Sequence, residues 1–202
     1  MTIVNRGLAV FVLILAVLLG AVAYEIGWFG GKPAETTQAP LPVGGPFTLT
    51  DQNGATRSDS DFRGKLMLIY FGYTYCPDTC PTVLLAMSQA LDRLGAQASA
   101  VQPIFITIDP ARDTPAQMKL YAANFHPSLL ALTGSPEAIV QVEKEYRVYA
   151  AKAPQQSRDD YLDYLEDHSS MIYLMGRDGK FLTLFSPGAS ADSMAATIKT
   201  KL

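Results

Sequence analysis

Hydrophobic positions along this chain follow two different patterns, one confined to the amino terminus and one spread over the rest. Residues 8–23 form an apolar run without a charged side chain. With its flanks this run supplies about 20 apolar residues, enough for one helix to cross a hydrocarbon core roughly 30 Å thick. Trp28 and Phe29 follow it, and aromatic side chains of this kind favour the membrane interface. The pattern therefore predicts a cytoplasmic amino terminus at residues 1–7 and a transmembrane anchor at residues 8–29.

Charges around the apolar run predict its orientation. Arg6 precedes the run and Glu25 follows it, which favours an amino terminus on the cytoplasmic side. A cleaved signal peptide is the alternative, because Ala21-Val22-Ala23 resembles a small-residue cleavage site, but the length of the run favours a retained anchor. Both interpretations predict that the rest of the chain is exported. We expect a single-pass protein of a bacterial inner membrane with its carboxyl-terminal domain in the periplasm.

The segment after the apolar run has the composition of a flexible linker. Residues 30–46 contain mostly Gly, Pro, Thr and Ala, with almost no large apolar side chain. Such a segment cannot bury enough apolar surface to fold by itself. We therefore predict a linker at residues 30–46 that allows an exported domain, residues 47–202, to reach a partner in the membrane.

Residues 47–202 alternate apolar and polar stretches, as the strands and helices of a soluble domain do. The run LMLIYFGY at residues 66–73 is almost continuously apolar, which is typical of a central strand buried on both faces. The predicted strands are residues 47–50, 66–73, 103–109 and 129–134, with a hairpin over residues 170–185 that turns at Asp178-Gly179. The predicted helices are residues 82–95 with Pro81 in the first turn and Gly95 as C-cap, 115–125, 136–148 with Ser135 as N-cap, and a tail from Ser190.

The order of these elements predicts the fold. Strands alternate with helices until a final hairpin and helix, so we expect a mixed sheet with helices on both faces. A cysteine pair falls between the end of the strand at residues 66–73 and the start of the next helix, which is the arrangement of thioredoxin-like proteins. The predicted fold class is α/β, a thioredoxin-like mixed sheet flanked by helices and preceded by one transmembrane helix.

Charge narrows the range of partners. The chain carries a formal net charge of −3, and its Lys and Arg residues are scattered along the sequence. Because the sequence contains neither a basic stripe nor a basic cluster interleaved with aromatic residues, nucleic acid is not an expected partner.

Cys76 and Cys80 are the only cysteines in the chain. A disulfide between them would close a very short loop and add little stability, so the pair is better explained by chemistry than by stapling. A helix N-terminus lowers the pKa of a nearby thiol, and the resulting thiolate is both a nucleophile and a soft metal ligand. We therefore expect a redox pair or a metal site here, with a plain structural disulfide as the alternative.

A metal held by two thiolates needs at least one more ligand, and the chain contains only two histidines. His168 directly precedes the predicted hairpin, in a loop that a thioredoxin-like fold can bring to the cysteines, and Asp167 is placed to orient its imidazole. His126 lies at a predicted helix end, where interaction with the helix dipole is the better explanation. Two thiolates and one imidazole suit Cu(I), and transiently Cu(II), whereas structural zinc normally has four protein ligands.

Three sequence blocks together resemble one known family. They are F-G-Y-T-Y-C-P-D-T-C-P at residues 71–81, I-D-P-A-R-D-T-P at residues 108–115 and D-Y-L-E-D-H-S-S at residues 163–170. In this order, over nearly the whole exported domain and behind a single anchor, they resemble the SCO/SenC family of copper chaperones. The combination is far more specific than a lone C-x-x-x-C motif.

The resemblance implies a thioredoxin-like domain that binds copper through Cys76, Cys80 and His168. It also implies a role in building the dinuclear copper centre, CuA, of cytochrome c oxidase subunit II, by delivering copper, by reducing the cysteines of that subunit, or by both. Other copper chaperones are further expected partners. Asp78 matches a family position, and we expect it to dock a partner or to support the copper ligands.

Two other residues and two other function classes stay open at this point. Asp109 and Arg112 match family positions, but a structural ion pair or a helix cap explains them as well. The leading interpretation is a metallochaperone without catalytic residues, which can also act as a thiol–disulfide reductase. A periplasmic thiol–disulfide oxidoreductase that uses only the cysteine pair is the main rival, and a peroxide-reducing enzyme is a weaker one. His168 separates the first two, because only the metallochaperone needs it as a ligand.

Overall fold

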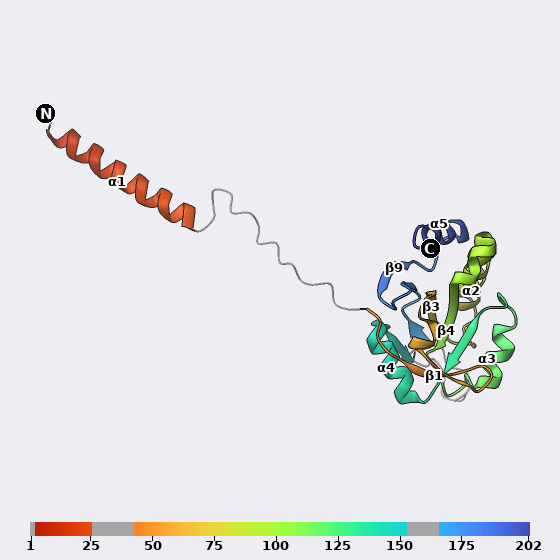
Figure 1. Ribbon diagram of the computed structural model, residues 1–202. Coiled ribbons are helices and arrows are strands. Elements are labelled where there is room, and N and C mark those ends of the chain that lie inside the picture. The colour runs from red at the N-terminus through yellow and green to blue at the C-terminus, as the bar shows by residue number, and fades with distance from the viewer. Residues whose placement is uncertain (1–2, 26–42, 153–165) are drawn as a thin grey trace. The chain divides into compact units, whose positions relative to one another are not determined.

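The computed structural model of the chain describes residues 3–25, 43–152 and 166–202 (Figure 1). The chain divides into two compact units, residues 1–41 and residues 42–202.

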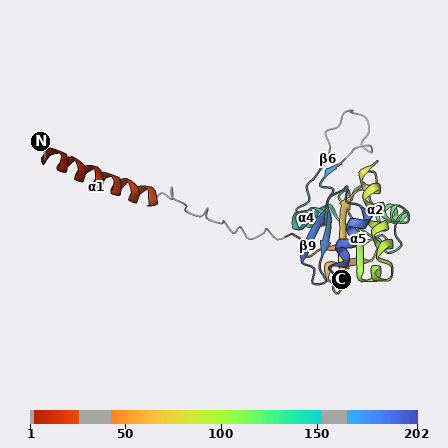
Figure 2. The same cartoon turned by 90° about the horizontal axis from the view of Figure 1, so that it is seen from above.

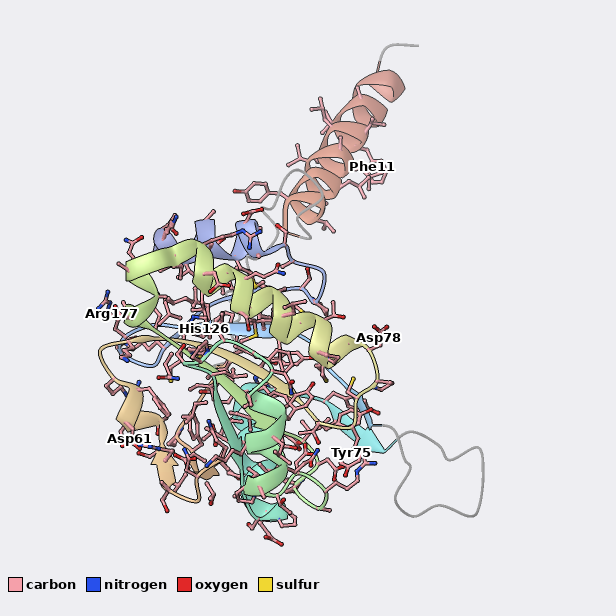
Figure 3. The ribbon with its side chains drawn as sticks, turned by 90° about the vertical axis from the view of Figure 1, so that its right-hand side faces the viewer. Phe11, Asp61, Tyr75, Asp78, His126 and Arg177 are labelled. Atoms are coloured by element: carbon pink, nitrogen blue, oxygen red, sulfur yellow. The ribbon has the colours of Figure 1, made fainter. Side chains whose placement is uncertain are left out.

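The first unit contains one helix, α1 (Ile3–Glu25), among its described residues. Large apolar side chains along it, between Val10 and Val22, are exposed, and Figure 3 labels one of them, Phe11. Within the described part of the chain, none of the helices combines the length and the apolar character that a membrane span requires. The transmembrane anchor predicted at residues 8–29 is therefore not confirmed; its last residues, and residues 30–42 of the predicted linker, lie outside the described ranges.

The second unit is built on a seven-stranded sheet with the strand order β2-β1-β5-β4-β3-β8-β9. Its strands are β1 (Thr48–Asp51), β2 (Thr56–Ser58), β3 (Leu66–Gly72), β4 (Val101–Thr107), β5 (Leu130–Thr133), β8 (Ile172–Met175) and β9 (Phe181–Phe185). Strands β3, β4 and β5 run parallel, and β1, β8 and β9 each pair antiparallel with their neighbours. The predicted mixed sheet is confirmed.

Helices cover both faces of this sheet, as predicted. They are α2 (Thr79–Leu94), α3 (Pro115–Ala122), α4 (Pro136–Tyr146) and α5 (Ala191–Lys199), with short 3-10 helices η1 (Asp59–Phe62) and η2 (Gly95–Ala100). Neighbouring residues of β3 point to opposite faces. Tyr70 stacks on Phe105, which contacts Tyr121 of α3, whereas Phe71 contacts Tyr146 of α4. Helices α2 and α3 therefore lie over one face with α5, which packs against α2, and α4 covers the other (Figure 1).

Sequence patterns explain the best-defined elements. Every residue of β3 is buried, as expected for a strand with a neighbour on each side and helices on each face. The predicted caps are present: Ser135 Oγ accepts a hydrogen bond from the Ala138 N–H at the start of α4, and Gly95 ends α2 at a φ of 56°. Helix α3 ends at Ala122, earlier than predicted, because the Asn124 side chain donates hydrogen bonds to the carbonyls of Leu120 and Tyr121.

A second sheet was not predicted. Strand β6 (Ala150–Lys152) pairs antiparallel with β7 (Glu166–His168) to form a two-stranded ribbon. His168 was predicted at a loop-to-strand junction directly before the hairpin; it precedes β8, but as the last residue of β7. Neither short segment shows an alternating apolar pattern, so periodicity could not find strands whose pairing is with each other. The ribbon and the start of α2 lie at the same end of the domain (Figures 2 and 3).

Candidate metal and redox site

The two cysteines lie where β3 is joined to α2, in residues 73–80, which we call the cysteine loop and which include the first two residues of α2. Cys76 is half-buried in the turn before α2, and Cys80 is fully buried in its first turn. The Cys80 backbone N–H donates a hydrogen bond to Cys76 Sγ at 3.4 Å. A sulfur atom thus accepts one of the N–H groups that a helix start leaves without an intrahelical partner.

Asp78 occupies the position at which a helix-capping side chain would normally act. Its side chain is exposed and makes no capping hydrogen bond to the described start of α2. Figure 3 shows Asp78 and Tyr75 at the same end of the domain. Because Cys76 supplies the capping acceptor, the Asp78 carboxylate stands on the surface beside the cysteines.

The sulfur of Cys80 sits in a closely fitted pocket of the sheet face. The Tyr70 hydroxyl donates a hydrogen bond to it at 3.4 Å. A Cβ atom added at Gly72 would lie 2.7 Å from the same sulfur and 3.1 Å from atoms of Tyr70 and Phe105. Glycine at position 72 is therefore what leaves room for the sulfur.

The environment raises the pKa of the Cys80 thiol, chiefly through its hydrogen bond with the Cys76 side chain and then through burial. Hydrogen bonds from the Tyr70 hydroxyl and the Tyr73 backbone lower the pKa by less. The expectation that the helix N-terminus lowers the pKa of the thiols is wrong for Cys80, because its hydrogen bond with Cys76 and its desolvation both favour the neutral thiol.

The buried side chain of Asp113 holds the cysteine loop in place through Thr74. This fully buried carboxylate accepts hydrogen bonds from the Thr74 N–H at 3.0 Å, the Thr74 hydroxyl at 2.6 Å and the Thr107 hydroxyl at 2.6 Å. Burial raises its pKa, and the hydrogen bonds from Thr107 and Thr74 partly oppose that shift. Support of the cysteine loop by Asp113 was not predicted, and the next residue, Thr114, caps α3. The signal available in the sequence was a second acid in the same block as Asp109.

Arg112 holds the outer side of the loop. Its guanidinium forms an ion pair with Asp109, and the two side chains are only 7% and 2% exposed. The same group lies 4.7 Å from the ring centroid of Tyr75 and 5.8 Å from that of Tyr73, within the range of cation–π attraction. The ion pair expected as one alternative is present. Its guanidinium contacts two aromatic residues that come shortly before Cys76 in the chain.

For His168, the predicted third ligand, the structure describes the backbone but not the side chain. His168 lies opposite Ala150, and Asp167 opposite Ala151, in the ribbon. At the base of the ribbon the Ser169 N–H donates to the Tyr149 carbonyl at 2.9 Å, and the Tyr149 N–H donates to the Ser169 hydroxyl at 3.2 Å. The side chains of His168 and Asp167 lie outside the described set, so their roles stay predictions.

Among the side chains that the structure describes, no group of three His, Cys, Asp or Glu residues comes together as a metal site. His126, the other histidine, bonds locally: its Nδ1 lies 2.7 Å from the Ser128 hydroxyl, and its backbone N–H donates to Ser88 Oγ of α2. It lies beside the later turns of α2, away from Asp78 (Figure 3). The described part of the candidate site is therefore the sulfur pair and the residues that support it.

Known proteins share both the sequence and the fold. The sequence profile of the SCO1/SenC family matches residues 35–202. The mitochondrial SCO2 homolog of Bos taurus is 45% identical over 174 residues, which cover 84% of this chain and 64% of the bovine protein. The chain thus spans slightly less than two thirds of that relative.

Two solved structures bear on the site. ScoI of Bradyrhizobium japonicum, solved with copper bound, is 48% identical with a TM-score of 0.73, covering 79% of this chain and 99% of ScoI. BsSco is 27% identical with a TM-score of 0.62, covering 81% of this chain and 96% of BsSco. BsSco is a member of the Sco family of cytochrome c oxidase assembly proteins in which a disulfide switch was identified. These similarities confirm the predicted thioredoxin-like mixed α/β fold.

Proposed function

The chain belongs to the SCO1/SenC family, as its three sequence blocks predicted, and from this premise we propose that it is a copper metallochaperone. Its cargo is one Cu(I) ion, held by Cys76, Cys80 and His168. One observation carries the proposal: the sulfur of Cys76 meets the backbone of Cys80 at the start of α2, 3.4 Å from its N–H. The copper bound in the related ScoI supports the choice of metal.

The chemistry of the donors fits this cargo. Two thiolates are soft ligands and favour Cu(I) over harder divalent ions. Cys76, the more accessible sulfur, is the one that we expect to meet an incoming or leaving copper ion first. Cys80 lies behind it, so its proton leaves as copper arrives, because metal binding displaces protons from thiol ligands. An imidazole from the ribbon completes a three-coordinate site, which also tolerates Cu(II) transiently.

The proposed partners are cytochrome c oxidase subunit II, whose CuA centre the protein helps to assemble, and other copper chaperones that supply the ion. The related BsSco, named as a member of a family of oxidase assembly proteins, supports this assignment. In the proposed interaction Asp78, exposed beside the cysteines, contacts the partner, and Asp167 orients the imidazole of His168.

The second candidate function is thiol–disulfide exchange through the same pair. In that reaction the dithiol of Cys76 and Cys80 loses two electrons and two protons, and the disulfide of subunit II gains them. The contact between the two cysteines and the disulfide switch of BsSco favour this candidate. Copper delivery and cysteine reduction are compatible, because one sulfur pair serves both.

We further propose that residues 8–29 hold the exported domain at a bacterial inner membrane, with the domain in the periplasm. The exposed apolar side chains of α1 support this proposal, since such side chains are most stable in a nonpolar environment. Fractionation of cells that express the full chain checks it: the protein should stay with membranes after an alkaline wash.

An anaerobic Cu(I) titration of the full chain against a competing chelator tests the metallochaperone. We expect one tightly bound ion, loss of tight binding in His168→Ala, and little change in the matched control His126→Ala. X-ray absorption should find two sulfur neighbours and one nitrogen neighbour. Unchanged affinity in His168→Ala would remove the histidine from the site, and fewer than two sulfur neighbours would remove the proposal.

A further inference from the structure

The hydroxyl group of Tyr70 touches the buried sulfur of the site. It donates a hydrogen bond to Cys80 Sγ at 3.4 Å. Burial raises the pKa of Tyr70, and the nearby Ser170 side chain partly opposes that shift. Tyr70 is fully buried in the central strand β3. A buried hydroxyl that donates a hydrogen bond has little freedom to turn away.

We propose that Tyr70 is a positioning residue for copper: its hydroxyl fixes the direction of the Cys80 sulfur and stabilises the charge on that sulfur when copper is bound. The inference rests on the proposed copper site and deepens it. Nothing in the sequence pattern alone marks Tyr70, because a tyrosine in an apolar run is expected to be ordinary core.

The sheet holds Tyr70 rigidly in place. Its backbone lies between Phe105 of β4 and Ile172 of β8, and its ring stacks on Phe105 at 6.2 Å between centroids. On the other side of the contact, Gly72 leaves space for the sulfur and for nothing larger. The distance between the Tyr70 hydroxyl and Cys80 Sγ is therefore set by the packing of the core and not by the conformation of the surface loop.

Ser170 links this contact to the other half of the candidate site. It follows His168 by two residues and lies just before β8. The Tyr70 hydroxyl donates to Cys80, and Ser170 of the histidine segment is near enough to influence the pKa of Tyr70. A single hydroxyl therefore lies close to both segments that supply the proposed copper ligands.

Copper binding should strengthen the hydrogen bond from Tyr70. Hydrogen bonds to a charged acceptor are roughly twice as strong as those to a neutral one, and a copper-bound thiolate carries more negative charge than a thiol. Removing the hydroxyl therefore destabilises the copper-loaded state more than the copper-free state. It also raises the energy of the lone pairs on the Cys80 sulfur, because that sulfur no longer accepts a hydrogen bond.

Tyr121 provides a matched control from the same cluster of rings. Its ring lies 5.6 Å from that of Phe105, and its buried hydroxyl has no hydrogen-bond partner among the residues that the structure describes. Tyr70→Phe and Tyr121→Phe each remove one hydroxyl from one side of the same aromatic core. Only the first removes a donor to Cys80.

The test is a comparison of the full-length wild type with Tyr70→Phe and Tyr121→Phe, loaded with one copper ion. For Tyr70→Phe we expect about tenfold weaker Cu(I) binding and a shift of the sulfur-to-Cu(II) charge-transfer band to lower energy. Tyr121→Phe should match wild type in both. Wild-type affinity and an unmoved band in Tyr70→Phe would overturn the proposal, as would equal changes in the two variants.

A second measurement separates this proposal from the metallochaperone itself. Equilibration of the copper-free protein with reduced and oxidised glutathione converts one disulfide and two glutathione thiols into the dithiol and one glutathione disulfide. Loss of the Tyr70 donor disfavours the dithiol about threefold, a potential roughly 15 mV more negative. If wild type binds no copper, the metallochaperone proposal fails, but the shift in potential still shows whether the Tyr70 hydroxyl acts on the Cys80 sulfur. An unchanged potential in Tyr70→Phe would overturn the role of Tyr70.

Should Tyr70→Phe fail to fold, Ser170→Ala replaces it in the copper measurements. This variant leaves the core ring intact and removes only the Ser170 hydroxyl near the Tyr70 oxygen. We expect a smaller shift of the charge-transfer band in the same direction. No shift in Ser170→Ala would count against the proposed link.

Discussion

The two segments that supply the proposed copper ligands are attached to the fold in different ways. The cysteine loop is tied to the main sheet through a buried carboxylate, a buried ion pair and a buried hydroxyl, those of Asp113, Arg112 with Asp109, and Tyr70. The ribbon that carries His168 forms a separate two-stranded sheet, bonded at its base between Tyr149 and Ser169. The sulfur half of the site is built by the core, and the histidine half is attached beside it.

This difference suits two requirements of a metal carrier, which must hold the ion and must also release it. A soft metal needs its two sulfurs at a fixed separation, and rigid support reduces the reorganisation that binding requires. A cargo also has to leave, and a strand of a two-stranded ribbon pairs with one neighbour, whereas a central strand pairs with two, so we expect the ribbon to cost less to displace. The comparison therefore predicts that substitutions beneath the cysteine loop cost folding stability, whereas substitutions in the ribbon mainly affect the ligand.

The largest effect is expected from Asp113→Ala. This change leaves the Thr74 N–H, the Thr74 hydroxyl and the Thr107 hydroxyl without their acceptor, and each buried unsatisfied group costs about 1–3 kcal/mol. We expect a loss of at least ~3 kcal/mol in the free energy of unfolding. Urea unfolding of the full chain, followed by the near-ultraviolet circular dichroism of its buried tyrosines, measures it.

Asp113→Asn is the matched control, and pH sharpens the comparison. Asn keeps an acceptor and should lose only about 1 kcal/mol. Because burial raises the native pKa of Asp113 above 3.8, its protonated form stabilises the fold below that pH, and this contribution is lost as pH rises through the raised pKa. The stability advantage of wild type over Asp113→Asn should therefore shrink as the pH rises from below 3.8 through the raised pKa. A constant difference would mean that Asp113 does not titrate differently in the folded state.

An intermediate effect is expected from Gly72→Ala. The new Cβ would lie 2.7 Å from Cys80 Sγ, between Tyr70 and Phe105, so the sulfur must move. Overpacking of this kind costs about 1–3 kcal/mol, and the displaced sulfur should also bind Cu(I) more weakly. Both are measured on the same full-length protein, by urea unfolding and by chelator competition.

Gly134→Ala is the control for a methyl group added to a packed glycine. Its nearest neighbour would be the tip of the Leu49 side chain at 3.0 Å, which can turn aside, and the site is not involved. We expect unchanged copper affinity there. If Gly72→Ala bound copper as wild type does, the pocket around Cys80 would not position the sulfur.

Much of this fold could be predicted from the sequence, because its main elements carry local signals. The buried run at β3, the prolines that open α3 and α4 and the glycine that ends α2 each act within a few residues. The cysteine pair was placed correctly between β3 and α2 for the same reason. Ribbon pairing joins segments that are far apart in the chain, and no local pattern reports it.

Two supporting residues of the site, Asp113 and Tyr70, could not be predicted for a related reason, whereas the ion pair of Asp109 and Arg112 was expected as one alternative. Asp113 lies 39 positions from Thr74, which it bonds, and the Tyr70 contact with Cys80 depends on strand register. Contacts of this kind are set by the packed sheet and not by the spacing of residues. The raised pKa of Cys80 likewise follows from its hydrogen bond with Cys76 and from burial, which a helix-start argument does not contain.

The smallest effect on stability is expected at the base of the ribbon, in Ser169→Ala. The change removes one hydrogen bond, from the Tyr149 N–H to the Ser169 hydroxyl, and keeps the backbone bond between the same residues. Because this bond is solvent-accessible, its loss should cost about 0.5 kcal/mol or less. Copper affinity should fall more clearly, by about threefold, because the residue adjoins His168. Urea unfolding and Cu(I) competition, run beside Gly72→Ala, measure both quantities. A stability loss equal to that of Gly72→Ala would show that the ribbon unfolds with the core, and the contrast between the two halves of the site would be wrong.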